Sequence, residues 1–199
     1  MEEIKIILPV FAIILSIIAL YLNKRNIKRQ LRIGKLEEIL ENVLYLSNFY
    51  TQLLILSTDL KDINEKKLNN ENVEINEKQF REEIERFKNV IDKNKIQQVV
   101  SRTSVLTNAY LPNGSLKNRI LTFNHLLSIM FGSVMSEAYY ILEQNYKEGI
   151  PRRKKIGEFI IKIENDLIKE MNLGFSSLKN ESFKKYREDI FKKEMGLIE

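Results

Sequence analysis

The amino-acid sequence predicts an all-α protein, with one N-terminal transmembrane helix followed by a cytoplasmic antiparallel bundle of about four to five helices. Three observations lead to this prediction. The chain of 199 residues contains seven glycines and three prolines, a composition that favours long uninterrupted helices. Residues 6–22 carry no charge. Beyond residue 35, apolar residues recur at alternating steps of three and four, the spacing of one face of an α-helix.

The N-terminal segment is apolar over the length of one membrane crossing. Residues 4–22 would form a helix about 28 Å long, close to the hydrocarbon thickness of a bilayer. A cleaved secretion signal has a basic leader and a shorter apolar region, whereas here two glutamates come first. A buried helix of a soluble domain has a polar stripe, and this segment offers Ser16 and Tyr21. We therefore predict a transmembrane anchor over residues 1–23.

A basic juxtamembrane segment, residues 24–35, follows the anchor. It contains no acidic residue and six cations: Lys24, Arg25, Lys28, Arg29, Arg32 and Lys35. Positive charge on this side predicts that the N-terminus lies outside and the bundle lies in the cytoplasm, anchored in the inner (cytoplasmic) membrane of a bacterium. The same cations would lie against anionic lipid headgroups, each contributing about 1 kcal/mol, or would only set the orientation of the helix.

The net charge of the chain, +5, comes from this segment, because residues 36–199 contain equal numbers of acidic and basic residues. A domain that binds duplex nucleic acid normally has a basic surplus of its own, so binding to nucleic acid is not predicted. The chain has no cysteine, which excludes disulfides, thiolate metal sites and thiol nucleophiles.

The pattern of residues 36–199 predicts the bundle domain. Leu111 to Ser115 read "LPNGS", a break in which Pro112 stops one helix and Asn113 and Gly114 suit a tight turn. The predicted segments in chain order are a helix from 36 to about 64, a loop at 65–78, a helix from about 77 to 110, a helix from about 116 to 147, a connector at 149–155, a helix from 156 to 171 that ends at 172–174, and a mostly charged helix from about 177 to 195.

Two groups of residues in the bundle are candidate binding surfaces. Ser128, Gly132 and Ser136 are spaced by four and form a stripe with little side-chain bulk, which lets another backbone approach closely, from the same chain or from a second copy. The connector carries four consecutive cations that could hold an anion or ligand near a helix N-terminus, or could simply be a solvated loop: Arg152, Arg153, Lys154 and Lys155.

The sequence offers no catalytic constellation. His125 is the single histidine and has no acidic residue three or four positions away on its predicted helix, so we expect it to be a hydrogen-bonded residue in a packed face. The acidic clusters at 37–41 and 82–85 are typical of a solvated face rather than of a di-metal bundle site. No glycine-rich phosphate loop occurs. We therefore predict that the chain is not an enzyme and has no cofactor.

Two functional hypotheses fit these observations. The first is a membrane-anchored cytoplasmic protein that acts through protein–protein contacts, as an adaptor, scaffold or regulatory subunit, with a protein partner or a second copy of itself. The alternative is a small membrane effector, as in bacterial anti-phage defence, that binds a ligand, oligomerises and perturbs the bilayer. Both follow from the predicted anchor and the missing catalytic groups.

Overall fold

The computed structural model describes the backbone of residues 2–173 and 182–198 and the side chains of residues 13–172 and 182–198. Every regular element in these ranges is a helix, which confirms the predicted all-α class and the helical bundle. The elements in chain order are α1 (Glu2–Ser47), α2 (Tyr50–Leu68), α3 (Glu74–Val90), α4 (Lys93–Tyr110), α5 (Ser115–Met135), α6 (Tyr139–Asn145), α7 (Arg153–Leu173), α8 (Phe183–Lys185), the π-helical segment η1 (Tyr186–Phe191) and α9 (Lys192–Glu194).

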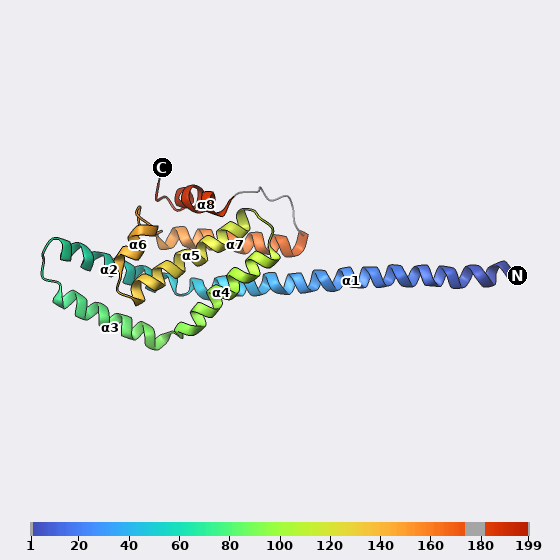
Figure 1. Ribbon diagram of the computed structural model, residues 1–199, viewed down its shortest axis with the longest axis horizontal. Coiled ribbons are helices and arrows are strands. Elements are labelled where there is room, and N and C mark those ends of the chain that lie inside the picture. The colour runs from blue at the N-terminus through green and yellow to red at the C-terminus, as the bar shows by residue number, and fades with distance from the viewer. Residues whose placement is uncertain (1, 174–181, 199) are drawn as a thin grey trace.

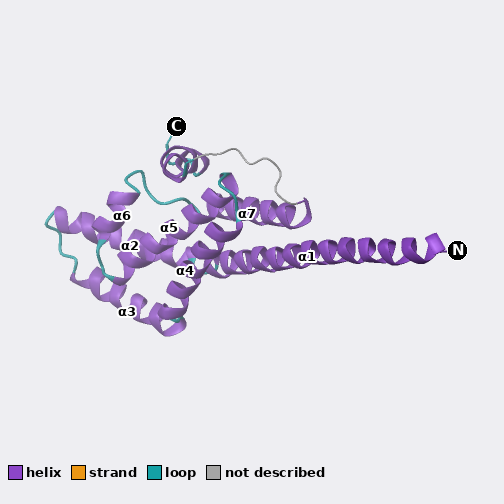
Figure 2. Ribbon diagram, turned by 45° about the vertical axis from the view of Figure 1, so that its right-hand side comes forward, coloured by secondary structure: helices purple, strands orange, loops and turns teal. Residues whose placement is uncertain are grey.

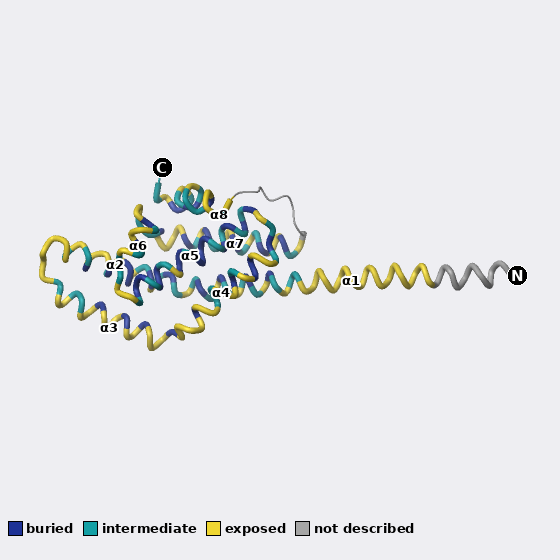
Figure 3. The backbone as a smooth tube through the Cα atoms, viewed as in Figure 1, coloured by how far each residue is buried: buried dark blue, intermediate teal, exposed yellow. Residues whose placement is uncertain are grey.

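The first helix, α1, is much longer than the others, and its N-terminal part projects from the bundle in both ribbon views (Figures 1 and 2). It contains 46 residues, which corresponds to about 69 Å of helix. Residues 13–31 are exposed, and Leu36 is the first buried residue among those whose side chains are described (Figure 3). The helix passes through Gly34 without interruption, so the predicted basic segment is a part of α1.

The structure describes the side chains of only a part of the predicted membrane span. Residues 4–12 of the span lie outside the described side chains. Over the residues whose placement is described, none of the helices combines the length and the apolar character that a membrane crossing requires.

The predicted helix over 36–64 is interrupted by a turn at Asn48 and Phe49, where α1 ends and α2 begins. The predicted loop at 65–78 is shorter in the structure and spans residues 69–73. Two lysines lie in the last turn of α2 and two glutamates in the first turn of α3. These charges interact favourably with the helix dipoles and stabilise the two helix ends. Both helices therefore extend into the segment predicted to be a loop.

The predicted helix over 77–110 is wrong in one respect, because the structure has two helices there, α3 and α4. Ile91 is extended, and the side chain of Asp92 accepts a hydrogen bond from the backbone N–H of Lys95 at 3.1 Å. Asp92 thus caps the N-terminus of α4, and the chain changes direction between the two helices.

The predicted helix over 116–147 is also two helices, α5 and α6. The backbone of Glu137 has a φ of 53°, in the left-handed region, and the Ser133 hydroxyl donates to the Ala138 carbonyl at 2.8 Å. The local hydrogen bond replaces helical bonding and ends α5. The apolar spacing continues across the break, which is why the sequence pattern does not reveal it.

The C-terminal third closes the bundle. Residues 174–181 lie outside the described residues. They include the last residue of the predicted helix end at 172–174 and the first residues of the predicted helix over 177–195. From Phe183 to Glu194 the chain is helical, with η1 at its centre. Tyr186 and Phe191 are buried, and the Phe191 ring packs edge-on against Phe159 of α7, with 5.3 Å between centroids. The segment is therefore anchored by aromatic burial.

Candidate functional site

The six cations of the basic segment are not equivalent in the structure. Lys24, Arg25 and Lys28 are exposed on the part of α1 that lies outside the bundle. The other three contact acceptors in described residues, with Arg29 donating to the Asn172 carbonyl at 3.4 Å, Arg32 pairing with Glu170 at 3.1 Å and Lys35 pairing with Glu38 at 2.7 Å. The first two contacts lie at the C-terminal end of α7, where the helix dipole favours cations.

The basic connector lies at the other end of the bundle. All four side chains from Arg152 to Lys155 are exposed. The Tyr50 hydroxyl donates to the Pro151 carbonyl, which places the connector beside the start of α2. Ser47, at the C-terminal end of α1, lies about 38 Å of helical rise beyond Leu22, and Tyr50 follows after a turn of two residues. The connector is thus remote from the projecting N-terminus (Figure 1), and it lines neither of the two adjoining cavities described below.

The small-residue stripe faces outward. Ser128 and Ser136 are exposed, and Gly132 is half-buried. A Cβ built on Gly132 would have nothing within 4 Å beyond the local backbone of its own helix, among the residues described. Within the described part of the chain, no other backbone approaches Gly132 closely. Self-association through the stripe stays a prediction.

His125 contacts the C-terminal segment. The Arg187 guanidinium lies 3.0 Å from Nε2 of His125, and the His125 ring centroid is 6.4 Å from that of Tyr146. Because arginine can only donate, Nε2 accepts, and the imidazole is neutral. Burial, and then the charge of Arg187, lowers the pKa of His125. His125 is therefore held in a half-buried contact between α5 and η1.

Acidic side chains converge at one small cavity between α2 and α3. This cavity, of about 170 Å³, is lined by Asp59, Asp62 and Glu83 together with Lys66. Burial raises the pKa of Asp59, and the neighbouring carboxylates raise it further. Across the described part of the chain, no three histidine or acidic side chains are placed to hold a metal ion.

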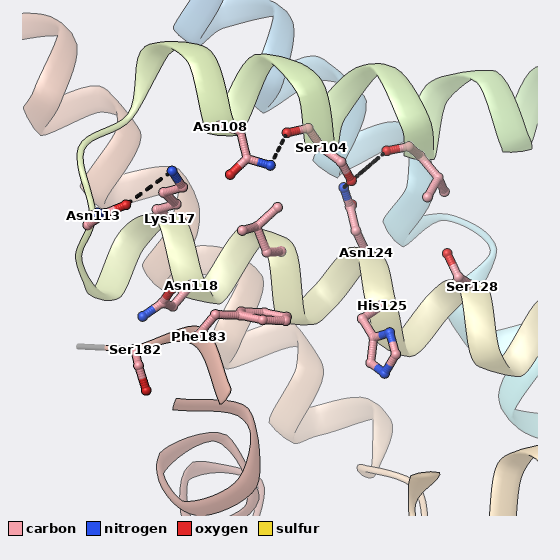
Figure 4. A pocket seen from close by; sticks show the side chains of 12 residues that line it. Ser104, Asn108, Asn113, Lys117, Asn118, Asn124, His125, Ser128, Ser182 and Phe183 are labelled. Atoms are coloured by element: carbon pink, nitrogen blue, oxygen red, sulfur yellow. Dashed lines mark hydrogen bonds between the residues drawn. The ribbon is translucent and has the colours of Figure 1, made fainter. Parts of the chain in front are cut away.

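A cavity lined mostly by polar residues lies between α4, α5 and α8 (Figure 4). Its volume is about 940 Å³. Amide, hydroxyl, amino and imidazole groups dominate the lining: Ser104, Asn108, Asn113, Lys117, Asn118, Asn124, His125, Ser128 and Ser182. Asn124 donates through Nδ2 to the Val100 carbonyl at 3.3 Å and to Ser104 Oγ at 3.1 Å.

A second cavity of about 300 Å³ adjoins the first and is apolar. Val100 and Ser128 line both cavities. The walls of the second cavity come from the α1–α2 junction, from α4 and from α5: Leu46, Phe49, Leu53, Ile96, Gln97, Val100, Ser101, Leu127, Ser128, Phe131 and Gly132. The small-residue stripe thus borders this cavity.

Ser128, Gly132 and His125 stand out in the sequence, but the cavities that they line are not predicted from it. The signal available in the sequence was the set of asparagines between residues 108 and 124. They come from two helices and the turn between them, so their convergence depends on the packing of α4 against α5.

Comparisons with known proteins give no independent indication of function. No family model, curated protein or solved structure matches the chain.

Proposed function

We propose that the chain is a single-pass membrane protein of the inner membrane, with its bundle in the cytoplasm, that acts through protein–protein contacts as an adaptor, scaffold or regulatory subunit. The observation that carries the proposal is the exposed part of α1. Side chains such as Ile13 and Leu20 are 59% and 70% exposed. Exposed apolar area costs about 25 cal/mol per Å² in water, and a bilayer would remove that cost.

The chemistry of the bundle supports contact rather than catalysis. His125 contacts Arg187, and residues 36–199 contain equal numbers of acidic and basic residues. Exposed apolar side chains on the bundle offer sites for a partner, among them Ile55, Val90, Val105, Tyr140 and Ile161. We assign no catalytic residue to the chain.

The anchor is tested by adding charge to α1. In the variant Ile14→Glu/Ile18→Glu the segment would carry two carboxylates at bilayer depth, each costing several kcal/mol. We expect this variant to leave the membrane fraction on alkaline carbonate extraction. The matched control is Leu68→Glu/Ile75→Glu, where both residues are more than 70% exposed on the bundle. Retention of the α1 variant in the membrane would contradict the anchor.

The contact function is tested by chemical crosslinking of the full chain in intact native membranes. We expect crosslinked species larger than the monomer that disappear when the anchor variant is used. A strictly monomeric chain without any crosslinked partner would contradict the proposal.

A second candidate function is a membrane effector that is triggered by a ligand. The observation that favours it is the continuity of α1, which passes without a break from the projecting segment into the bundle, so that a change in the bundle would be transmitted along the helix. Inducible expression with a membrane-potential dye tests this function. Absence of depolarisation and of growth arrest under every trigger would contradict it.

A further inference from the structure

The two adjoining cavities of the bundle are not explained by the proposed function. One is polar and the other apolar, and they meet at Val100 and Ser128. Small-molecule sites are concave, have volumes of about 300 to 1,000 Å³, and combine apolar walls with a few polar groups. Each of the two cavities has a volume within this range, and the pair combines apolar walls with polar groups.

The apolar cavity has the dimensions of a small-molecule site. Its walls come from three directions, with Phe49 from the α1–α2 junction, Ile96 from α4 and Phe131 from α5. Its volume is about 300 Å³. An α-helix with its side chains is about 10 Å across, so a partner helix could lie over the mouth of the cavity but could not fill it.

Gly132 at the border of this cavity is unexplained by the packing of the chain. A glycine inside a helix costs about 1 kcal/mol relative to alanine. Its usual compensation is the close approach of another group. In the described residues, nothing lies within 4 Å of a Cβ built on Gly132 apart from the local backbone. The glycine therefore leaves open space at the border of the cavity, as Gly34 and Gly157 do at other helical positions.

The polar cavity contains a buried acceptor without a donor. Asn124 is 2% exposed, and its Oδ1 has no hydrogen-bond partner among the described residues. The amide orientation is fixed, because Nδ2 must face the Val100 carbonyl. A buried polar atom without a partner costs about 1 to 3 kcal/mol. Because this oxygen is shielded from solvent, an occupant with an N–H or O–H group would supply the missing donor only after a shift of the Asn124 side chain.

The charges around the polar cavity favour a neutral or anionic head group. None of the described residues that line it is acidic, whereas Lys117 is among them. Arg187 lies 3.0 Å from His125, which also lines the cavity. Arg187 also pairs with Glu188 at 3.4 Å, and Glu188 does not line the cavity, so a cationic head would find no carboxylate among the described lining residues.

We propose that the bundle binds a small amphiphile, with its apolar end between Phe49, Ile96 and Phe131 and its neutral or anionic hydrogen-bonding head among the amides beside Asn124. This binding activity goes beyond the contact function and does not depend on the anchor. It gives the bundle a means of responding to a molecule that dissolves partly in the membrane.

The test uses a photoreactive decanoic acid probe with a diazirine in its chain and the full-length protein in phosphatidylcholine vesicles. We expect saturable labelling of the α5 peptide that contains Leu127 and Phe131. Gly132→Trp should fill the cavity and lower this labelling about tenfold, whereas the matched variant Gly132→Ala should keep it. A probe with the same chain and a trimethylammonium head should label the peptide about tenfold less than the acid does.

Two further measurements keep the outcome unambiguous. Ser128→Trp, at an exposed position shared by both cavities, should block labelling in the same way if Gly132→Trp does not fold. Labelling of α1 reports contact with the bilayer, so its loss would count against the anchor and not against the cavity. Labelling of α5 that does not saturate, or that is equal in the wild type and a folded tryptophan variant, would overturn the proposal.

Discussion

Arg32 of α1 forms an ion pair with Glu170 of α7, with 3.1 Å between the guanidinium Nη2 and the carboxylate Oε2. Glu170 is 4% exposed, and burial raises its pKa while Arg32 lowers it in part. The pair connects the base of the projecting helix to the end of α7. Together with the contact from Arg29 to the Asn172 carbonyl, it joins the basic segment to the bundle.

Removal of Arg32 should destabilise the bundle. In Arg32→Met the buried carboxylate of Glu170 loses its charged partner, and we expect the free energy of unfolding to fall by about 2 kcal/mol. Urea denaturation followed by circular dichroism measures the change. In the double variant Arg32→Met/Glu170→Leu the buried charge is gone, so most of the loss should be recovered.

Arg25→Met is the matched control, because it makes the same chemical change outside the bundle. We expect it to leave the free energy of unfolding unchanged within about 0.5 kcal/mol. Equal stability of the Arg32 and Arg25 variants would show that the pair with Glu170 contributes nothing.

The contact between His125 and Arg187 predicts a dependence of stability on pH. The pKa of His125 is lowered in the folded chain from the ordinary value of 6.5, so the unfolded chain binds the proton more strongly. Stability is therefore fully present above pH 6.5 and is lost as the pH falls toward the folded pKa. Protonation of Nε2 would also remove the acceptor of Arg187, so we expect lower hydrogen-exchange protection factors in η1, corrected for the intrinsic pH dependence of exchange, at about pH 5 than at about pH 7.

His125→Gln provides the control for this pH effect, because the amide oxygen can still accept from Arg187 and does not titrate. The difference in unfolding free energy between about pH 7 and about pH 5 should be smaller in this variant than in the wild type. Other groups that face the histidine, Tyr146 and the Glu188 partner of Arg187, are retained in both proteins. An unchanged pH profile would contradict a role for His125.

The sequence predicts the helical class and most helix positions, because apolar spacing reports burial and burial decides the helices of a bundle. It does not predict the breaks. The break before Asp92 has a local signal, since aspartate is a good N-cap residue. The break at Glu137 has none, because it depends on a hydrogen bond from Ser133 to Ala138 while the apolar pattern runs on.

The candidate sites show a similar division. The run of cations in residues 24–35 is visible in the sequence, but its division into exposed and docked side chains depends on where α7 ends. The cavities depend on side chains from α4, α5 and the α1–α2 junction, and no local pattern encodes a space between three segments.

Two glycines predict opposite effects of substitution by alanine. Gly157 lies in the helix α7, and a Cβ built there would meet nothing within 4 Å, so Gly157→Ala should stabilise the protein by about 0.5 to 1 kcal/mol. Gly149 has a φ of 105°, a conformation that alanine rarely adopts, so Gly149→Ala should destabilise it by about 1 kcal/mol or more. Thermal unfolding of the two variants measures the difference, and a shift in the same direction for both would contradict the backbone explanation.

Substitution of each of the two groups of cations in α1 should distinguish an effect on membrane orientation from an effect on the stability of the bundle. In Lys24→Gln/Arg25→Gln/Lys28→Gln the exposed charges are removed, and we expect loss of affinity for vesicles with anionic lipid, about 1 kcal/mol for each charge, with unchanged unfolding. In Arg29→Gln/Arg32→Gln/Lys35→Gln the same number of charges is removed where they contact Asn172, Glu170 and Glu38, so unfolding should become easier.

A reporter fused to the C-terminus measures the orientation of both triple variants. The positive-inside rule counts cations near the span and not their contacts, so each variant should place a similar fraction of reporters outside. The unfolding measurements should differ between the two triple variants, because only Arg29, Arg32 and Lys35 contact the bundle. If the variant without Lys24, Arg25 and Lys28 unfolded as easily as the variant without Arg29, Arg32 and Lys35, the division of the basic segment at Arg29 would be wrong. If neither variant changed the orientation of the reporter, the role of these cations in topology would be excluded.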